Sequence, residues 1–171
     1  PERQTMTLAD FLYRSFVMGA AATALLDVWA ILLNRLFGFG LPNWGFVGRW
    51  VAHLPAGRFA HDDIGQAAPV GNETTIGWIF HYAVGISFAM ATLLIGGSAW
   101  AKSPTLLIPL TVGIVTVGCG WFILQPALGA GIAASRKPDA ARIRTLNVVG
   151  HVVFGLGLWL VRSQATVGDV A

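Results

Sequence analysis

Long apolar runs dominate this chain. Four of them contain a single formally charged residue between them, Asp27, and they extend over residues 16–33, 76–99, 106–134 and 146–161. A helix of about 20 predominantly apolar residues crosses a bilayer. The pattern therefore predicts an all-α, integral membrane four-helix bundle, forming a single domain over residues 1–171, with transmembrane helices at about 12–37, 75–99, 104–131 and 144–162.

The composition agrees with a surface that faces lipid. Charged residues make up 11% of the sequence and hydrophobic residues 55%. An ordinary soluble domain is about 25% charged, so this chain cannot cover a globule of its size with polar side chains. The low charge content therefore excludes a typical cytosolic enzyme and a disordered chain. A nucleic-acid-binding protein is excluded because the net charge of +3 comes from scattered basic residues. The single cysteine, Cys119, lies in an apolar run and is expected to be buried.

The segment between the first two spans, about residues 38–74, is too long to be a simple connection. Its residues 43–50 read Asn-Trp-Gly-Phe-Val-Gly-Arg-Trp and combine aromatic side chains with an arginine. This composition favours an amphipathic helix in the membrane interface, or a lid over the bundle.

Basic residues are divided unevenly between the two ends of the predicted bundle. Cytoplasmic loops are enriched in Lys and Arg, so the richer end is expected in the cytoplasm and both termini on the other side of the membrane. The first and third loops hold seven basic residues, and the termini and second loop hold four: Arg35, Arg49, Arg58, Arg136, Lys137, Arg142 and Arg144, against Arg3, Arg14, Lys102 and Arg162.

Each of the four spans carries polar side chains that are costly inside a membrane. Counting inward from the long-loop end at about 1.5 Å per residue places the ionisable and amide groups roughly 9–15 Å below the same membrane face. Because four helices bring them to one depth, we expect them to meet inside the bundle as a candidate ligand or proton site. This intramembrane polar layer consists of Asp27, His81, Gln125, Asn147 and His151.

Small residues accompany the polar layer. Gly19 lies two helical turns before Asp27, and the motif His-x-x-x-Gly occurs at residues 81–85 and again at 151–155. Small-residue stripes let helices approach closely, so these faces are expected to point inward. The repeated motif also fits a tandem duplication of a two-helix hairpin. Pro126 lacks a backbone N–H and predicts a distortion in the third span.

Several chemistries fit this layer. His81 and His151 could hold a haem iron, and the same pair with Asp27 could hold a metal ion. A proton or small-solute pathway would use the same groups. The remaining interpretation is a hydrogen-bonded network that fixes the register of the helices. No cofactor is expected, because the glycine stripes favour tight helix contact and no His-x-x-x-His motif or cysteine pair is present.

The long loop carries a second polar group whose spacing matches no metal-ligand motif. A hydrated surface cluster is the expected interpretation, and an interfacial enzyme that uses residues 61–63 is an alternative. The sequence contains no nucleophile elbow, P-loop or dinucleotide fingerprint, so no catalytic residue is predicted. The members of this loop cluster are His53, Arg58, His61, Asp62 and Asp63.

Seven short runs resemble a bacterial family of small four-helix integral membrane proteins that is catalogued as a domain of unknown function. The resemblance covers about residues 20–160. It implies a multi-pass protein of the bacterial inner (plasma) membrane, in which the expected orientation makes both termini periplasmic, and it brings no activity to carry over. Family members often have an additional proline near Gly120, where this chain reads Cys119-Gly120, which leaves a second kink in doubt. The runs are residues 22–30, 47–50, 53–61, 77–82, 104–106, 125–135 and 151–155.

The predicted function is therefore non-enzymatic. We expect a small membrane protein that packs against a second copy of itself or serves as an accessory subunit of a larger membrane complex. The alternative is the binding or conduction of a proton, an ion, haem or a lipid-like ligand through the intramembrane polar layer.

Overall fold

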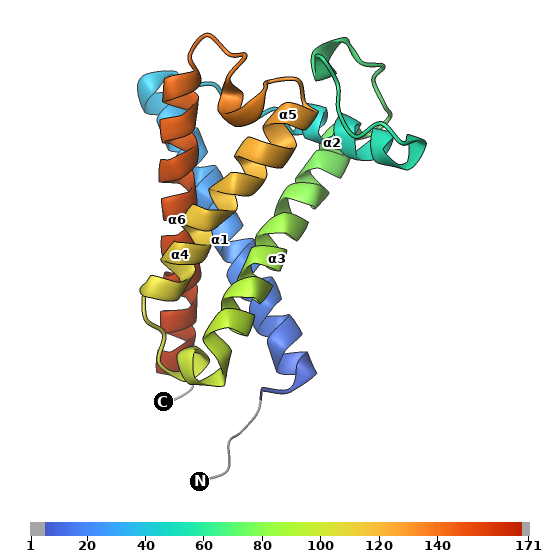
Figure 1. The fold of residues 1–171 in the computed structure, drawn as a ribbon. Helices are drawn as coiled ribbons and strands as arrows, with labels where there is room; N and C mark the ends of the chain where they lie inside the picture. The colour runs from blue at the N-terminus through green and yellow to red at the C-terminus, as the bar shows by residue number, and fades with distance from the viewer. Residues whose placement is uncertain (1–5, 169–171) are drawn as a thin grey trace.

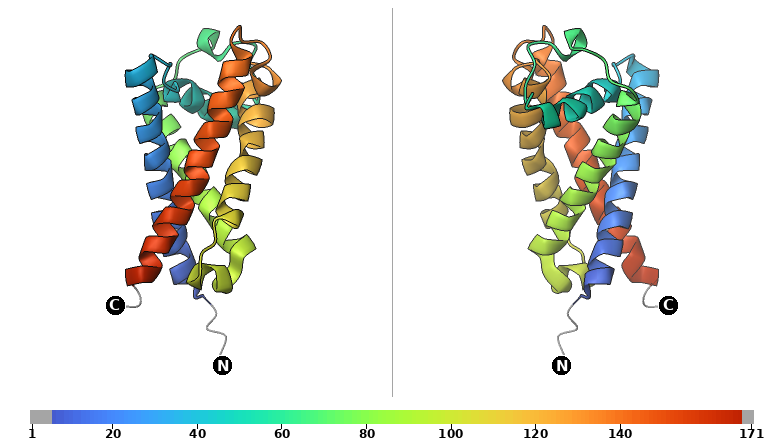
Figure 2. Two further views of the ribbon diagram at one scale, coloured as in Figure 1. Left: turned by 90° about the vertical axis from the view of Figure 1, so that its left-hand side faces the viewer. Right: turned by 90° about the vertical axis from the view of Figure 1, so that its right-hand side faces the viewer.

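The computed structural model describes residues 6–168, and it is all-α over that range (Figure 1). Four helical segments are long and apolar enough to cross a membrane. Both ends of the described chain lie at one end of the bundle, and the long first loop lies at the other (Figure 2). The spans are α1 (Leu8–Phe37), α3 (Glu73–Lys102), α4 (Leu107–Cys119) continued by α5 (Gln125–Ala127), and α6 (Ala140–Gly168).

The prediction of four long apolar helices is confirmed. Their ends differ from the predicted boundaries for local reasons. The hydroxyl of Thr7 accepts the backbone N–H of Asp10 and starts α1 earlier than predicted. The third span ends at Ala127 rather than near residue 131, because Gly129 and Gly131 have φ of +88° and +76°. That span begins at Leu107 rather than at residue 104.

A turn of π-helix, η3 (Gly120–Leu124), joins α4 to α5. The N–H of Gln125 donates to the carbonyl of Gly120, five residues earlier. The next residue is Pro126, which has no N–H to offer. The predicted distortion of this span is therefore present, in the form of a wider helical turn just before the proline.

The first loop contains the amphipathic helix that its composition predicts, α2 (Trp44–His53). Asn43 caps it by accepting the N–H of Phe46. α2 crosses the start of α3 at two glycines, where a Cβ on Gly48 would lie 1.7 Å from the carbonyl oxygen of Glu73 and one on Gly77 would lie 1.8 Å from that of Trp44. The short 3₁₀ turns η1 (Leu54–Ala56) and η2 (Ile64–Gln66) complete the loop.

The small-residue faces point inward, as the sequence predicts. Where α1 meets α3, a Cβ on Gly19 would lie 2.4 Å from the Cα of Ile86, and one on Gly85 would lie 2.0 Å from the hydroxyl of Thr23. Where α4 meets α6, a Cβ on Gly113 would lie 2.5 Å from the carbonyl oxygen of His151. Both contacts therefore depend on the absence of a side chain.

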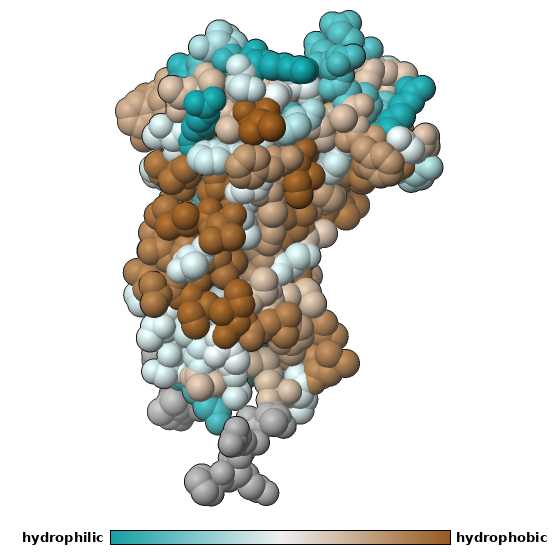
Figure 3. All heavy atoms as spheres, viewed as in Figure 1, coloured by the Kyte–Doolittle hydropathy of each residue, from teal (hydrophilic) through white to brown (hydrophobic). Residues whose placement is uncertain are grey.

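The outward surface of the spans is apolar. Apolar side chains form a broad band around the middle of the molecule, and hydrophilic residues gather mainly at the loop end (Figure 3). Leu94, Leu107 and Val115 are each about 70% exposed. The prediction of a buried Cys119 is wrong, because this residue lies on the exposed side of its helix, where no neighbouring element covers it. In a bilayer such a surface lies against lipid or another helix.

Candidate functional site

Asp27 on α1 and two consecutive residues of α3 form the first polar site. The Nε2 atom of His81 lies 3.0 Å from one carboxylate oxygen of Asp27, and the hydroxyl of Tyr82 donates to the other oxygen at 3.0 Å. The side chains of His81 and Asp27 are 13% and 18% exposed. A carboxylate in this position has a hydrogen-bond partner at each oxygen, which offsets much of the cost of taking it out of water.

Aromatic rings surround the imidazole of this site. The indole of Trp44, at the start of α2, stacks on the ring of His81 with centroids 3.9 Å apart and an interplanar angle of 25°. Trp78 and Tyr82 approach the same imidazole at 5.8 Å and 5.5 Å, close to edge-on. A stacked indole attracts an imidazolium through its ring quadrupole. The interfacial helix therefore covers the site.

The groups of the first site allow two roles. A carboxylate, an imidazole and a phenol are all titratable and lie in one hydrogen-bonded chain. Their arrangement can hold a proton between Asp27 and His81, with Tyr82 fixing the second carboxylate oxygen. It can equally hold α1 and α3 in register, because the groups come from both helices.

The second polar site joins α4 to α6 and is built from neutral partners. The Nδ1 atom of His151 lies 3.1 Å from the hydroxyl of Thr116 and 3.0 Å from the carbonyl oxygen of Gly113. One turn nearer the loop end, Asn147 accepts hydrogen bonds from the indole of Trp121 at 3.1 Å and the amide of Gln125 at 2.8 Å. The carbonyl oxygen of the Gln125 side chain is buried without a partner.

The polar layer that the sequence predicts is thus divided between two sites. Asp27 and His81 meet at the first site, and Gln125 meets Asn147 at the second, beside His151. Among residues 6–168, none of the assigned hydrogen bonds joins one site to the other. The hydrogen bonds of the sites join α1 to α3 and α4 to α6, although α1 also packs against α6, where Leu26 approaches Gly150. Equal depth, even on neighbouring helices, therefore does not bring all of the groups together.

Sequence reasoning misses four members of these sites. Tyr82 follows His81 directly, and consecutive helical residues are not expected to face one target. Trp44 comes from a loop whose fold over the bundle is not visible in a hydrophobic pattern. Thr116 and Trp121 look like ordinary residues of an apolar run, although an indole N–H inside a span needs an acceptor and could have been used as a signal.

The predicted loop cluster is only partly brought together. The Nδ1 atom of His53 lies 3.0 Å from Nε2 of His61. Asp63 accepts the N–H of Gly65, and the carbonyl of Asp62 packs against Gly129. Arg58 has an exposed side chain. Within the described part of the chain, no three His, Cys, Asp or Glu side chains are grouped as metal ligands.

From the sequence, Arg49 counts only among the basic residues that indicate membrane orientation. In the structure its side chain is buried and holds the first loop against the start of α3. Its buried guanidinium makes two 2.8 Å contacts with the carboxylate of Glu73, and it also donates to the carbonyls of Ile64 and Ala67 at 3.0 Å. The hydrogen bond to Glu73 raises the pKa of Arg49 above its ordinary value. The loop is therefore a fixed cap on the start of α3.

Comparison with known proteins gives one match. A family model described as a protein of unknown function (DUF2938) covers residues 16–165. No curated protein and no solved structure matches the chain. The resemblance to a family of unknown function is confirmed, and the matched residues 16–165 include part or all of each of the four long helices.

Proposed function

The chain belongs to the DUF2938 family of proteins of unknown function, and from this premise we propose a role for it in membrane assembly. It is a non-enzymatic, multi-pass protein of the bacterial inner membrane that works by packing. It assembles as a homo-oligomer or as an accessory subunit of a larger membrane complex, and it needs no cofactor.

One observation carries this proposal. The ionisable groups of the polar layer find partners inside the chain, at the contacts of α1 with α3 and of α4 with α6. Hydrogen-bonded groups of this kind fix helix register. The outward faces are left apolar, with Ile95, Val115 and Phe122 each more than half exposed. A bundle whose helices are joined by internal hydrogen bonds and whose outer surface is apolar is suited to lie against other membrane helices.

The distribution of charge supports a cytoplasmic loop end. Within residues 6–168, that end carries seven basic residues and the opposite end carries Arg14, Lys102 and Arg162; Arg3 falls outside the described residues. The excess favours cytoplasmic first and third loops and periplasmic termini. A reporter fused to the C-terminus tests this orientation. A signal from the cytoplasm would contradict it.

The packing role is tested by the state of the purified protein. Native mass spectrometry from lipid nanodiscs is expected to show two or more copies of the chain, or one copy with a stoichiometric second subunit. The exposed Cys119 offers a parallel test of a homo-oligomer by thiol cross-linking in membranes, with Cys119→Ser as the matched control. Single chains in both measurements would contradict the proposal.

A second candidate function is reversible proton binding at the first site. It is favoured by one observation, the chain of three titratable groups in which Asp27 lies 3.0 Å from both His81 and Tyr82. Proton uptake by liposomes that contain the protein would support it, provided that the Asp27→Asn variant folds and loses the uptake. Equal uptake by both proteins would contradict it.

A further inference from the structure

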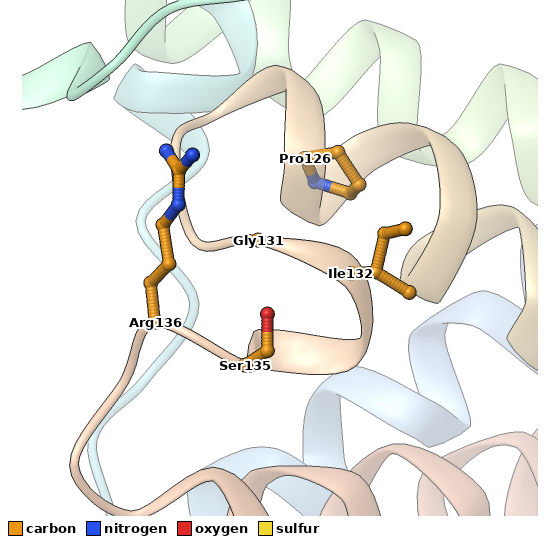
Figure 4. Close-up of a pocket in the computed structure, with 5 residues that line it drawn as sticks. All are labelled: Pro126, Gly131, Ile132, Ser135 and Arg136. Atoms are coloured by element: carbon orange, nitrogen blue, oxygen red, sulfur yellow. The ribbon is translucent and has the colours of Figure 1, made fainter.

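The turn between α5 and α6 borders an open pocket at the loop end of the bundle. Its volume is about 300 Å³, and Figure 4 shows its lining residues, which come from the end of α5 and from the turn: Pro126, Gly131, Ile132, Ser135 and Arg136. Pro126 and Ile132 form one wall, and the hydroxyl of Ser135 and the side chain of Arg136 belong to the other (Figure 4).

The backbone holds this turn in a defined shape. The N–H of Arg136 donates to the carbonyl of Ala130 at 2.9 Å, and Nε of Arg144 donates to the carbonyl of Ala133 at 2.7 Å. Ala133 and Ala134 have φ of +48° and +57°, a conformation that non-glycine residues rarely adopt without such support. The pocket is therefore a built feature of the turn.

The cations around the pocket are used differently. Arg142 is paired with Asp139, and Arg144 is bound to the backbone of the turn. For the side chain of Arg136, no ion pair or hydrogen bond is assigned within residues 6–168, and the side chain is exposed. The guanidinium of Arg136 and the hydroxyl of Ser135 lie at separate points of the rim (Figure 4), and together they offer several N–H and O–H donors to an occupant that extends between them. This is the donor set that binds phosphate oxygens.

The other wall of the pocket determines which phosphate fits. Ile132 is apolar and 58% exposed, and Pro126 follows the apolar third span directly. An occupant with an anionic phosphate on one side and hydrocarbon on the other satisfies both walls. We propose that this pocket binds the headgroup of an anionic phospholipid, with Arg136 and Ser135 at the phosphate and Ile132 at the acyl chains. The proposal needs the chain to span a membrane but does not depend on its packing partner.

The test uses the full chain in mild detergent, titrated with phosphatidylglycerol and followed by native mass spectrometry. Arg136→Gln is expected to weaken lipid binding about tenfold, since it removes a charged donor to phosphate. Lys137→Gln is the matched control, because it removes the same charge from the neighbouring exposed residue, which does not line the pocket. Its binding is expected to stay within about twofold of the unaltered protein.

Two further arms separate the sources of phosphate. Ile132→Ser is expected to weaken phosphatidylglycerol binding, and millimolar inorganic phosphate is expected not to displace the lipid. Equal losses in Arg136→Gln and Lys137→Gln would overturn the proposal in favour of diffuse attraction to positive charge. Displacement by inorganic phosphate, with no effect of Ile132→Ser, would overturn the lipid assignment. Unchanged melting temperatures of the variants verify that folding is intact.

Discussion

The two polar sites use one motif in different surroundings. Each places a histidine one turn before a glycine, at residues 81–85 in α3 and 151–155 in α6, and each glycine packs against the preceding span. At the first site the partner helix supplies the carboxylate of Asp27, whereas at the second it supplies the hydroxyl of Thr116. The motif therefore sets how closely the helices pack, and the partner helix decides whether the site can carry charge.

The groups around the two histidines also differ. The stacked indole of Trp44 covers the imidazole of His81, so the interfacial helix takes part in the first site. The second site lies among α4, η3, α5 and α6, and it joins the imidazole of His151 and the amides of Gln125 and Asn147 to an indole, a hydroxyl and a backbone carbonyl. The first site thus joins three titratable side chains, whereas in the second site the hydrogen-bond partners of the imidazole are neutral groups.

The largest effect is expected where the two sites are alike, at their glycine contacts. Gly19→Ala and Gly113→Ala place a methyl group within 2.5 Å of backbone atoms on the neighbouring helix, so the helices must separate. Each change is expected to lower the free energy of unfolding by about 3 kcal/mol. The measurement is thermal unfolding in detergent.

Gly118→Ala is the control for that prediction. Its new methyl group would meet the side chain of Phe122 at 3.6 Å, an ordinary contact. Its stability is expected to change by less than about 0.5 kcal/mol. If all three alanine variants unfold alike, then close approach at these glycines does not hold α1 to α3 or α4 to α6.

A smaller effect is expected where the sites differ, at Asp27. Asp27→Leu leaves the imidazole of His81 and the hydroxyl of Tyr82 without their acceptor, and is expected to cost about 2 kcal/mol. Asp27→Asn keeps the shape and one acceptor, and is expected to recover part of that loss. Denaturant titrations of the two variants check the order. A Leu variant as stable as the unaltered protein would show that the pair does not join α1 to α3.

The smallest effect is expected at the neutral site. Thr116→Val removes a hydroxyl from His151, but the imidazole keeps the carbonyl of Gly113 as an acceptor. The expected loss is about 1 kcal/mol or less. The same unfolding assay applies, and a loss larger than that of Asp27→Leu would reverse the ranking of the two sites.

The fold can be predicted from the sequence more completely than the site can. Apolar runs locate the four spans, and the Asn-Trp-Gly-Phe segment identifies the interfacial helix, because both signals depend on local composition. The rise of a helix also places Asp27 and His81 at one depth. Depth is one coordinate of three, however, and it does not give the direction in which a side chain points around its helix. That is why five residues at one level separate into two sites.

The missed partners have a common cause. Tyr82, Trp44 and Thr116 become members of a site through the approach of a second element, and nothing in their own segments records that approach. Arg49 is similar, since its ion pair with Glu73 forms between the loop and the start of α3. Contacts of this kind depend on tertiary packing, and they are read from the structure alone.

The separation of the two sites is tested most directly by NMR of the protein with labelled histidine side chains. Asp27→Asn is expected to move the signals of His81 and leave those of His151 in place, and Thr116→Val is expected to do the opposite. Comparable shifts of both histidines in either variant would contradict the account. They would mean that the polar groups of the four spans form one connected layer.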